Sequence, residues 1–230
     1  MKVKLFLSGG GSEKDSYDFD NKFINSLKLR KILYVPVAME RDKQGYESCY
    51  DWITSSLTQF DKNFVEISMC TELDEISNMK LNAFSAIYFG GGNTYRLLAK
   101  IYSSGLNKLL LKYIKNGGIC YGGSAGAIIM GKSIETVPEE NDKSYTFTDG
   151  LGLLGNFSLI CHFDKSVEDK KKNIEKFLIK HRTPIIALPE GSGLLVDDEK
   201  IQMFGRSESI IFYPDGEQKK FLHEQEINLN

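Results

Sequence analysis

Residues 121–127 are Tyr-Gly-Gly-Ser-Ala-Gly-Ala, and this stretch decides which fold and which chemistry we expect. It continues the apolar run Gly118–Tyr121, typical of a buried strand, into the apolar run Ala125–Met130, typical of a buried helix. A small-x-Ser-x-Gly pattern between a strand and a helix predicts a nucleophile elbow. The turn is sharp, so small neighbours are needed and the hydroxyl of Ser124 projects from strained backbone.

A second glycine-rich turn follows the β-like run Ala86–Phe89, where Gly90-Gly91-Gly92-Asn93-Thr94 precedes residues with helical spacing. Three glycines allow the backbone to approach a ligand closely, and Asn93 or Thr94 would cap the helix. A phosphate-binding loop is the alternative, but the Lys-Ser/Thr pair and the G-x-G-x-x-G spacing are absent. We therefore predict an oxyanion hole formed by the N–H of Ala125 and by that of Gly91 or Gly92.

A nucleophilic serine needs a base, and the chain has three histidines. His181 ends a helix-like run, where a cation is favoured by the helix dipole, and His223 lies in a polar tail. His162 directly follows the apolar run Leu159–Cys161, at a strand end. We predict that His162 is the general base, and a core histidine is the alternative interpretation.

Four motifs occur in order along the chain and together resemble the S51 serine peptidases, a family that includes the peptidase E group of aspartyl dipeptidases and the cyanophycinases. The motifs are Gly90–Thr94, Gly122–Ala127, Cys161–Asp164 and Leu188–Gly191. The resemblance extends from Lys2 to about Tyr213. It implies a three-layer α/β sandwich of the class I glutamine amidotransferase-like (flavodoxin-like) type. It also implies a Ser-His-acid triad.

The acid of that triad has two candidates. The resemblance to peptidase E points to Glu139, in the polar stretch Pro138–Ser144, although the family carries aspartate there. The resemblance to cyanophycinases points to Glu190, which follows the strand-like run Ile185–Leu188. A strand end is held more rigidly than a loop, so we favour Glu190 and keep Glu139 open.

Substrate contacts are harder to predict. An Asp-X dipeptidase needs a cation for the aspartate carboxylate, and the candidates are Lys170 and Arg96; Asn93, in the glycine-rich turn that precedes Arg96, is a further candidate for substrate binding. Peptidase E carries arginines where this chain has Lys170–Lys172. Because lysine cannot form a bidentate clamp, we expect a looser preference for N-terminal aspartate. A solvated helix face is the alternative interpretation of these lysines.

Composition restricts the remaining possibilities. We expect one domain over residues 1–230, and the net charge of −2 gives no electrostatic case for nucleic acid or an anionic membrane. No apolar run approaches the ~20 residues of a membrane helix, so we expect a cytoplasmic protein. Four cysteines without a C-x-x-C pattern predict free thiols and neither a metal nor a cofactor. The oligomeric state stays open between monomer and homodimer.

Strand-like and helix-like runs alternate along the chain, which predicts a mostly parallel, doubly wound sheet. After Glu190 the runs are short and β-like, which indicates an antiparallel edge, and the polar tail after Asp215 is expected to fray. The predicted strands are Val3–Leu7, Ile32–Val37, Phe64–Ile67, Ala86–Phe89, Ile119–Tyr121, Leu159–Cys161, Ile185–Leu188, Leu194–Val196, Ile201–Phe204 and Ile210–Tyr213.

The sequence thus predicts a serine peptidase that hydrolyses small peptides through an acyl-enzyme, with dipeptides carrying N-terminal Asp as the expected substrates. Three alternatives use the same fold: β-aspartyl peptide hydrolysis as in cyanophycinases, an esterase or amidase with the same triad, and a catalytically silent small-molecule-binding protein.

Overall fold

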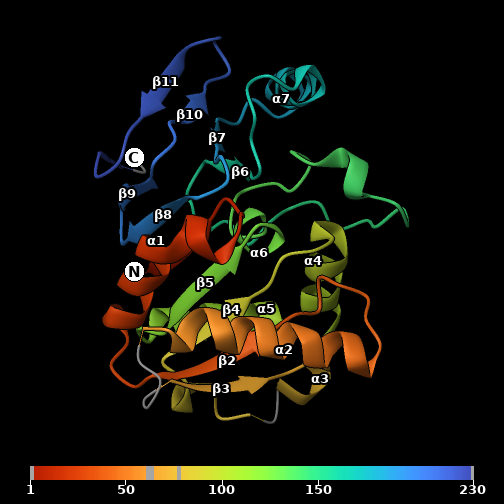
Figure 1. The fold of residues 1–230 in the computed structure, drawn as a ribbon. Coiled ribbons are helices and arrows are strands. Elements are labelled where there is room, and N and C mark those ends of the chain that lie inside the picture. Colours follow the sequence, from red (N-terminus) through yellow and green to blue (C-terminus); the bar gives the residue numbers. More distant parts are fainter. Residues whose placement is uncertain (1–2, 61–64, 77–78, 229–230) are drawn as a thin grey trace.

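An eight-stranded sheet forms the centre of the computed structural model, which describes residues 3–60, 65–76 and 79–228 (Figure 1). Its strand order is β12-β9-β8-β1-β5-β4-β2-β3, and the five strands from β1 to β3 run parallel. β8, β9 and β12 extend it in antiparallel fashion. The strands are β1 Lys4–Ser8, β2 Lys31–Val35, β3 Glu66–Met69, β4 Ala86–Phe89, β5 Ile119–Gly123, β8 Ser192–Asp197, β9 Lys200–Gly205 and β12 Glu226–Asn228.

Helices cover both faces of this sheet and complete the three layers that the sequence predicts (Figure 1). One apolar cluster joins α1 and α2 to one face, and a larger cluster joins α3, α4, α5 and α6 to the other. The helices are α1 Glu13–Ser26, α2 Lys43–Thr58, α3 Leu73–Ile76, α4 Thr94–Ser103, α5 Leu106–Lys115, α6 Ala125–Ile128 and α7 Glu168–His181, with 3-10 turns η1 at Leu81–Ala83 and η2 at Pro138–Glu140.

The starts of α2 and α4 follow from local side-chain chemistry. Asp42 accepts the Gly45 N–H at 2.8 Å to begin α2. Asn93 accepts the Arg96 N–H at 2.9 Å to begin α4, as one of the two residues predicted for that cap. Such caps satisfy backbone donors that have no partner inside the helix.

A second, four-stranded sheet was not predicted. The predicted runs Leu159–Cys161 and Ile185–Leu188 form buried strands, as expected, but these strands, β6 and β7, pair in parallel with each other, away from the main sheet. β10 and β11 complete this sheet in antiparallel fashion, and α7 lies beside it (Figure 1). The strands are β6 Ser158–Ile160, β7 Ile185–Ala187, β10 Ser209–Phe212 and β11 Gln218–Phe221.

The expectation of a frayed tail is wrong for the described part of the chain. After Asp215, β11 pairs with β10, and β12 pairs with β9 at the edge of the main sheet. Phe221 is buried and Ile227 packs against the core, so these apolar side chains in a polar segment help to hold the tail in place. The predicted strand at Phe64–Ile67 lies partly outside the described residues, because Phe64 does.

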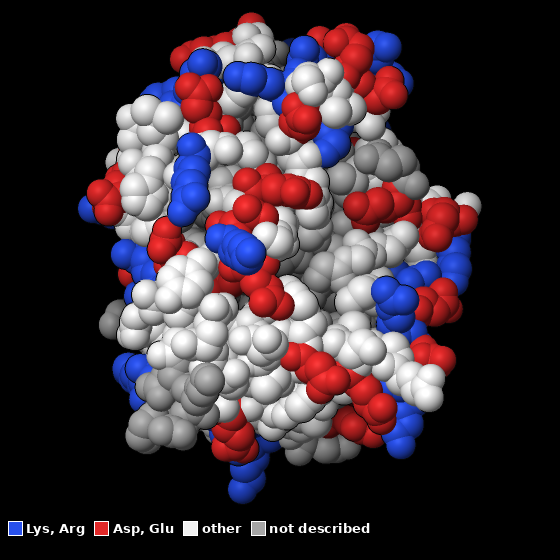
Figure 2. Space-filling model, in the orientation of Figure 1, with Lys and Arg blue, Asp and Glu red and all other residues white. Residues whose placement is uncertain are grey.

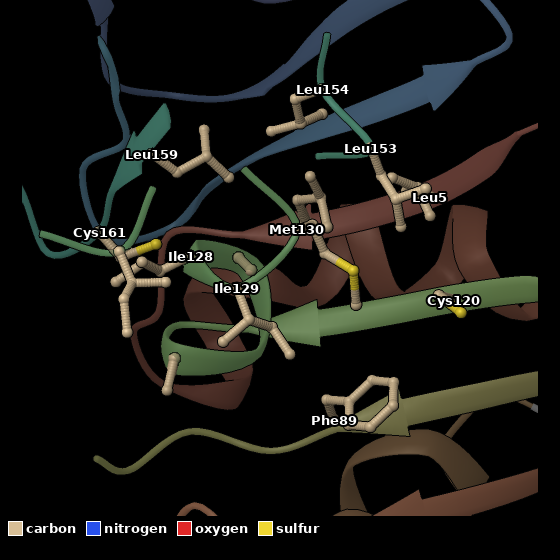
Figure 3. Packing of buried hydrophobic residues seen from close by; sticks show 14 of the residues in the cluster. Leu5, Phe89, Cys120, Ile128, Ile129, Met130, Leu153, Leu154, Leu159 and Cys161 are labelled. Atoms are coloured by element: carbon tan, nitrogen blue, oxygen red, sulfur yellow. The ribbon is translucent and has the colours of Figure 1, made fainter. Parts of the chain in front are cut away.

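The segment after the predicted elbow joins the two sheets. Ile128, Ile129 and Met130 are buried and belong to the larger apolar cluster. Figure 3 shows them between Leu5 and Phe89 of the main sheet and Leu159 of β6. This apolar packing fixes the end of β5 relative to the smaller sheet.

None of the helices in the described part of the chain combines the length and apolar character that crossing a membrane requires. The cysteines Cys49, Cys70, Cys120 and Cys161 are all buried free thiols.

Asp20 of α1 is a buried carboxylate beneath the end of β5. Its Oδ1 accepts the Tyr121 hydroxyl at 2.6 Å and its Oδ2 accepts the Ser16 hydroxyl at 2.6 Å. Burial raises the pKa of Asp20 from 3.8 to about 6, and these two hydrogen bonds offset only part of that effect. The native state therefore holds a proton at Asp20 that the unfolded chain releases near pH 4.

We predict that the free energy of unfolding falls as pH rises from about 3 to about 7, by about 3 kcal/mol from Asp20 alone. The sign follows because the native pKa is raised, so the stabilisation is complete below the unfolded pKa and is lost as Asp20 ionises. Denaturant unfolding of wild type and Asp20→Asn at both pH values tests this. Parallel pH dependence in the two proteins would contradict it.

Candidate active site

Ser124 lies where β5 ends and α6 begins, in the backbone conformation expected of an elbow. Its φ is 51° and its ψ is −110°, which costs about 1–3 kcal/mol for a residue with a side chain. Gly126 lets α6 approach β4, since a Cβ there would lie 2.4 Å from the Phe89 carbonyl oxygen. The close packing of α6 against β4 thus helps to hold the strained serine.

The structure brings Ser124, His162 and Glu190 together in series. Ser124 Oγ lies 2.8 Å from His162 Nε2, and His162 Nδ1 lies 2.8 Å from Glu190 Oε1. The side chains of His162 and Glu190 are 43% and 60% exposed, so a ligand can reach them directly from solvent. A serine, an imidazole and a carboxylate linked in this order form the arrangement used by serine hydrolases.

One short segment positions all three residues through backbone hydrogen bonds. We call it the β1 loop (Ser8–Gly10), the end of β1 and the two residues after it. The Ser8 carbonyl accepts the Ser124 N–H at 3.0 Å, and the Gly9 carbonyl accepts the His162 N–H at 2.9 Å. The Gly10 carbonyl accepts the N–H of Gly191, the neighbour of Glu190, at 2.9 Å.

The sequence analysis missed the β1 loop, although its signal is visible as Ser8 and three glycines after the predicted strand Val3–Leu7. Gly10 has a φ of +94° and lies against the His162 ring. A Cβ at this position would lie 2.2 Å from His162 Cε1. Only glycine therefore allows the loop to support the imidazole from this side.

The predicted oxyanion donors lie around the nucleophile. Gly91 is adjacent to Ser124, since a Cβ on Gly91 would lie 3.4 Å from Ser124 Cβ. Gly92 has a φ of +134° and packs against the backbone of Ala38. Ala125 is the first residue of α6, so its N–H has no acceptor within the helix.

Two predicted substrate contacts are engaged within the protein. Asn93 donates to the Glu140 carbonyl at 2.7 Å in addition to capping α4. Arg96 donates to Glu40 Oε2 at 2.8 Å. Both side chains thus hold the glycine-rich loop in place, which is a role that spacing along the sequence does not reveal.

Lys170, the third predicted contact, reaches the site itself. Its ammonium group donates to the carbonyl oxygen of His162. The neighbouring Lys171 and Lys172 pair with Glu168 and Asp169 at 3.9 Å on the surface of α7. The lysine run therefore contains one residue at the site and two on a solvated helix face.

The loop that carries Glu139 forms η2. The structure describes the side chain of Glu140 but not that of its neighbour Glu139. Glu140 Oε2 accepts the Thr94 N–H at 2.6 Å, at the start of α4. A carboxylate from this loop thus serves the glycine-rich turn, while the imidazole has Glu190 as its partner.

The other histidines lie in structural contacts. His181 ends α7, stacks on Phe177 and has its Nε2 2.9 Å from Glu135 Oε2. His223 contacts the ring of Phe204 in the C-terminal segment. Among the described residues, no cluster of three or more His, Cys, Asp or Glu side chains has the arrangement of a metal site.

Two cavities adjoin the site. One, of about 860 Å³, lies beside His162 and Glu190 and is lined by Lys165, Lys170 and Lys220 among others. The second, of about 460 Å³, is lined by Gly91 and residues of α2. Acidic and basic side chains alternate over the face in Figure 2 without a large patch of one sign.

The fold and the Ser-His-Glu arrangement define a hydrolase of the serine type, and comparison with known proteins narrows the class. The sequence model of peptidase family S51 matches residues 5–204. The chain therefore belongs to that family of serine-type peptidases.

The relatives agree with this assignment. Peptidase E of Pasteurella multocida (strain Pm70) is 26% identical over 226 residues, covering 92% of this chain and 93% of that protein. A Drosophila melanogaster protein named "Probable alpha-aspartyl dipeptidase" is 26% identical over 201 residues, covering 83% and 79%. The crystal structure of a peptidase from an acI-B1 Actinobacterium has a TM-score of 0.76 at 19% identity, covering 99% and 97%.

We predict that Gly10→Ala lowers kcat for dipeptide hydrolysis by about a hundredfold, because the added methyl displaces the imidazole. Gly117→Ala is the matched control, since Gly117 also has a positive φ of +86° but a Cβ there meets nothing within 4 Å. Circular dichroism checks that both variants fold. Equal kcat in the two folded variants would refute a positioning role for Gly10.

Proposed function

We propose that the chain hydrolyses small peptides with Ser124 as nucleophile, His162 as general base and Glu190 as the acid that orients the imidazole. The observation that supports this most directly is the unbroken series of 2.8 Å contacts from Ser124 through His162 to Glu190. The strained backbone at Ser124 adds weight, because such strain persists where surrounding structure enforces it for function.

The proposed reaction proceeds in two halves. Ser124 Oγ attacks the peptide carbonyl carbon while its proton passes to His162 Nε2, and Glu190 stabilises the resulting imidazolium. The N–H groups of Ala125 and of Gly91 or Gly92 stabilise the oxyanion. The intermediate collapses as His162 returns the proton to the leaving amine, which gives an acyl-enzyme and the free amine. Water, deprotonated by His162, then releases the acid and restores Ser124.

For substrate, we propose dipeptides and other short peptides with an acidic N-terminal residue. The Lys170 ammonium, placed at the backbone of His162, supports this proposal because it is a cation at the edge of the site. Lysine acts as a point charge without the fixed fork of arginine, which favours a graded preference for aspartate. Arg96 and Asn93 are proposed to act indirectly, through the shape of the glycine-rich loop.

We propose that the protein works in the cytoplasm, where thiols stay reduced, and its four buried free cysteines suit such a compartment. The same acyl-enzyme chemistry would cleave an activated ester or amide. Turnover of β-aspartyl peptides in preference to α-aspartyl ones would favour the cyanophycinase-like alternative. Binding without turnover would favour a silent binding protein.

We predict that Glu190→Gln lowers kcat by about a hundredfold or more, and that Glu139→Gln lowers it far less. A neutral amide cannot stabilise the imidazolium, and it favours the wrong tautomer of the ring. Steady-state hydrolysis of an Asp-X dipeptide measures both variants, with Ser124→Ala as the inactive reference. A larger loss in Glu139→Gln would transfer the acid role to the loop of η2.

We predict that kcat/KM for Asp-Leu exceeds that for Asn-Leu by about tenfold, because a single lysine charge replaces an arginine clamp. Casein should be a poor substrate, since a long chain offers only one N-terminal residue and the proposed specificity acts at that end. Competitive hydrolysis of a mixed dipeptide set, analysed by mass spectrometry, gives these ratios. Equal rates for Asp-Leu and Asn-Leu, or rapid casein digestion, would count against the proposed specificity.

A further inference from the structure

The cavity between α2 and the glycine-rich loop has no role in the mechanism above, although it adjoins the nucleophile. It has a volume of about 460 Å³. Its lining includes Tyr34, Met39, Arg41, Cys49, Trp52 and Gly91. The walls are mainly apolar and aromatic, which is the usual character of a pocket for a small organic ligand.

This cavity lies next to the proposed catalytic serine, because Gly91 contacts both. Gly91 lines the cavity, and a Cβ on Gly91 would lie 4.0 Å from Ser124 Oγ. A peptide bond bound at Ser124 would therefore place an adjoining residue of the peptide within reach of the cavity. Trp52 is 42% exposed there, so its indole is free to contact a ligand.

Arg41 gives the cavity a single cationic group. Its aliphatic stem packs over Gly45, where a Cβ would lie 2.9 Å from it, and its Nη2 lies 3.7 Å from the Met39 sulfur. Among the described residues no carboxylate lies within ion-pair distance of its guanidinium, whereas Arg96 is paired with Glu40. An exposed guanidinium beside an apolar wall fits a ligand with both a carboxylate and an apolar group.

We propose that this cavity binds the C-terminal residue of the peptide substrate, with its apolar side chain against Trp52 and its terminal carboxylate on Arg41. An N-terminal aspartate offers a carboxylate but almost no apolar surface. The C-terminal residue of a short peptide offers both, so it matches this pairing better. The inference rests on the proposed function, because it takes a short peptide at Ser124 as the ligand.

The cavity would thereby set peptide length and the preference at the leaving residue. A longer chain would place a neutral peptide group where the terminal carboxylate belongs and lose the charge-assisted hydrogen bonds to Arg41. A glycine at the C-terminus would leave the apolar wall in contact with water. The expected substrate class is therefore short peptides that end in Leu, Met or Phe with a free carboxylate.

Trp52 provides the readout, because it is the one tryptophan in the sequence. Peptides bind without being cleaved in the Ser124→Ala background, so fluorescence titration measures binding apart from turnover. We expect Asp-Leu to change the Trp52 emission and to bind about tenfold or more tightly than the amide Asp-Leu-NH2 and than Asp-Gly. Arg41→Gln should remove the difference between acid and amide, and Arg41→Lys should retain part of it.

Arg182→Gln is the matched control, since Arg182 is exposed at the end of α7, away from this cavity. It should leave every affinity unchanged. Equal binding of Asp-Leu and Asp-Leu-NH2, or no Trp52 response to any peptide, would overturn the proposal. The proposal would also be overturned if Arg41→Gln removed the difference in affinity between Asp-Leu and Asn-Leu and left the difference between Asp-Leu and Asp-Leu-NH2 intact. Arg41 would then bind the aspartate side chain and not the terminal carboxylate. If Asp-Leu bound tightly and through Arg41 but the wild-type protein did not cleave it, the proposed peptidase function would be refuted while the proposed binding site would stand.

Discussion

Three consecutive carbonyl groups at the end of β1 determine the geometry on which the rest of the site depends. Ser8, Gly9 and Gly10 accept the N–H groups of Ser124, His162 and Gly191. The three donors follow β5, β6 and β7, which belong to two different sheets. Because each bond joins backbone to backbone, the spacing of the three backbone segments that carry the side chains does not depend on rotamers. Each such bond contributes about 1 kcal/mol, and together they fix one arrangement of the two sheets at the site.

The β1 loop can act in this way because its supports are rigid. β1 lies between β5 and β8 in the main sheet. The apolar segment Ile128–Met130 fills the space between that sheet and the smaller one (Figure 3). Burial of these side chains offsets the backbone strain at Ser124, since one fully buried apolar side chain contributes about 1.5–3 kcal/mol. The strain is thus a local cost within a well-packed interior.

Local patterns predicted most of the elements and the residues that meet at the site. The small-x-Ser-x-Gly turn predicted where Ser124 would lie. His162 and Glu190 follow predicted strands, but these strands belong to the smaller sheet, so the rule that parallel strands end at one edge of a sheet does not explain their meeting with Ser124. The partners of a buried strand are not encoded in its alternation, so the separate sheet of β6 and β7 was missed. The Arg96–Glu40 pair joins residues 56 positions apart, and no local pattern predicts such a contact.

The measurement that tests the central claim most directly is covalent labelling with a fluorophosphonate, located by mass spectrometry. Only a serine activated by a neighbouring base reacts quickly with such a reagent. The account predicts one adduct per chain, on Ser124, with labelling abolished in Ser124→Ala and slowed by orders of magnitude in His162→Ala. A folded protein that takes up no label, or that carries it on another residue, would contradict the account.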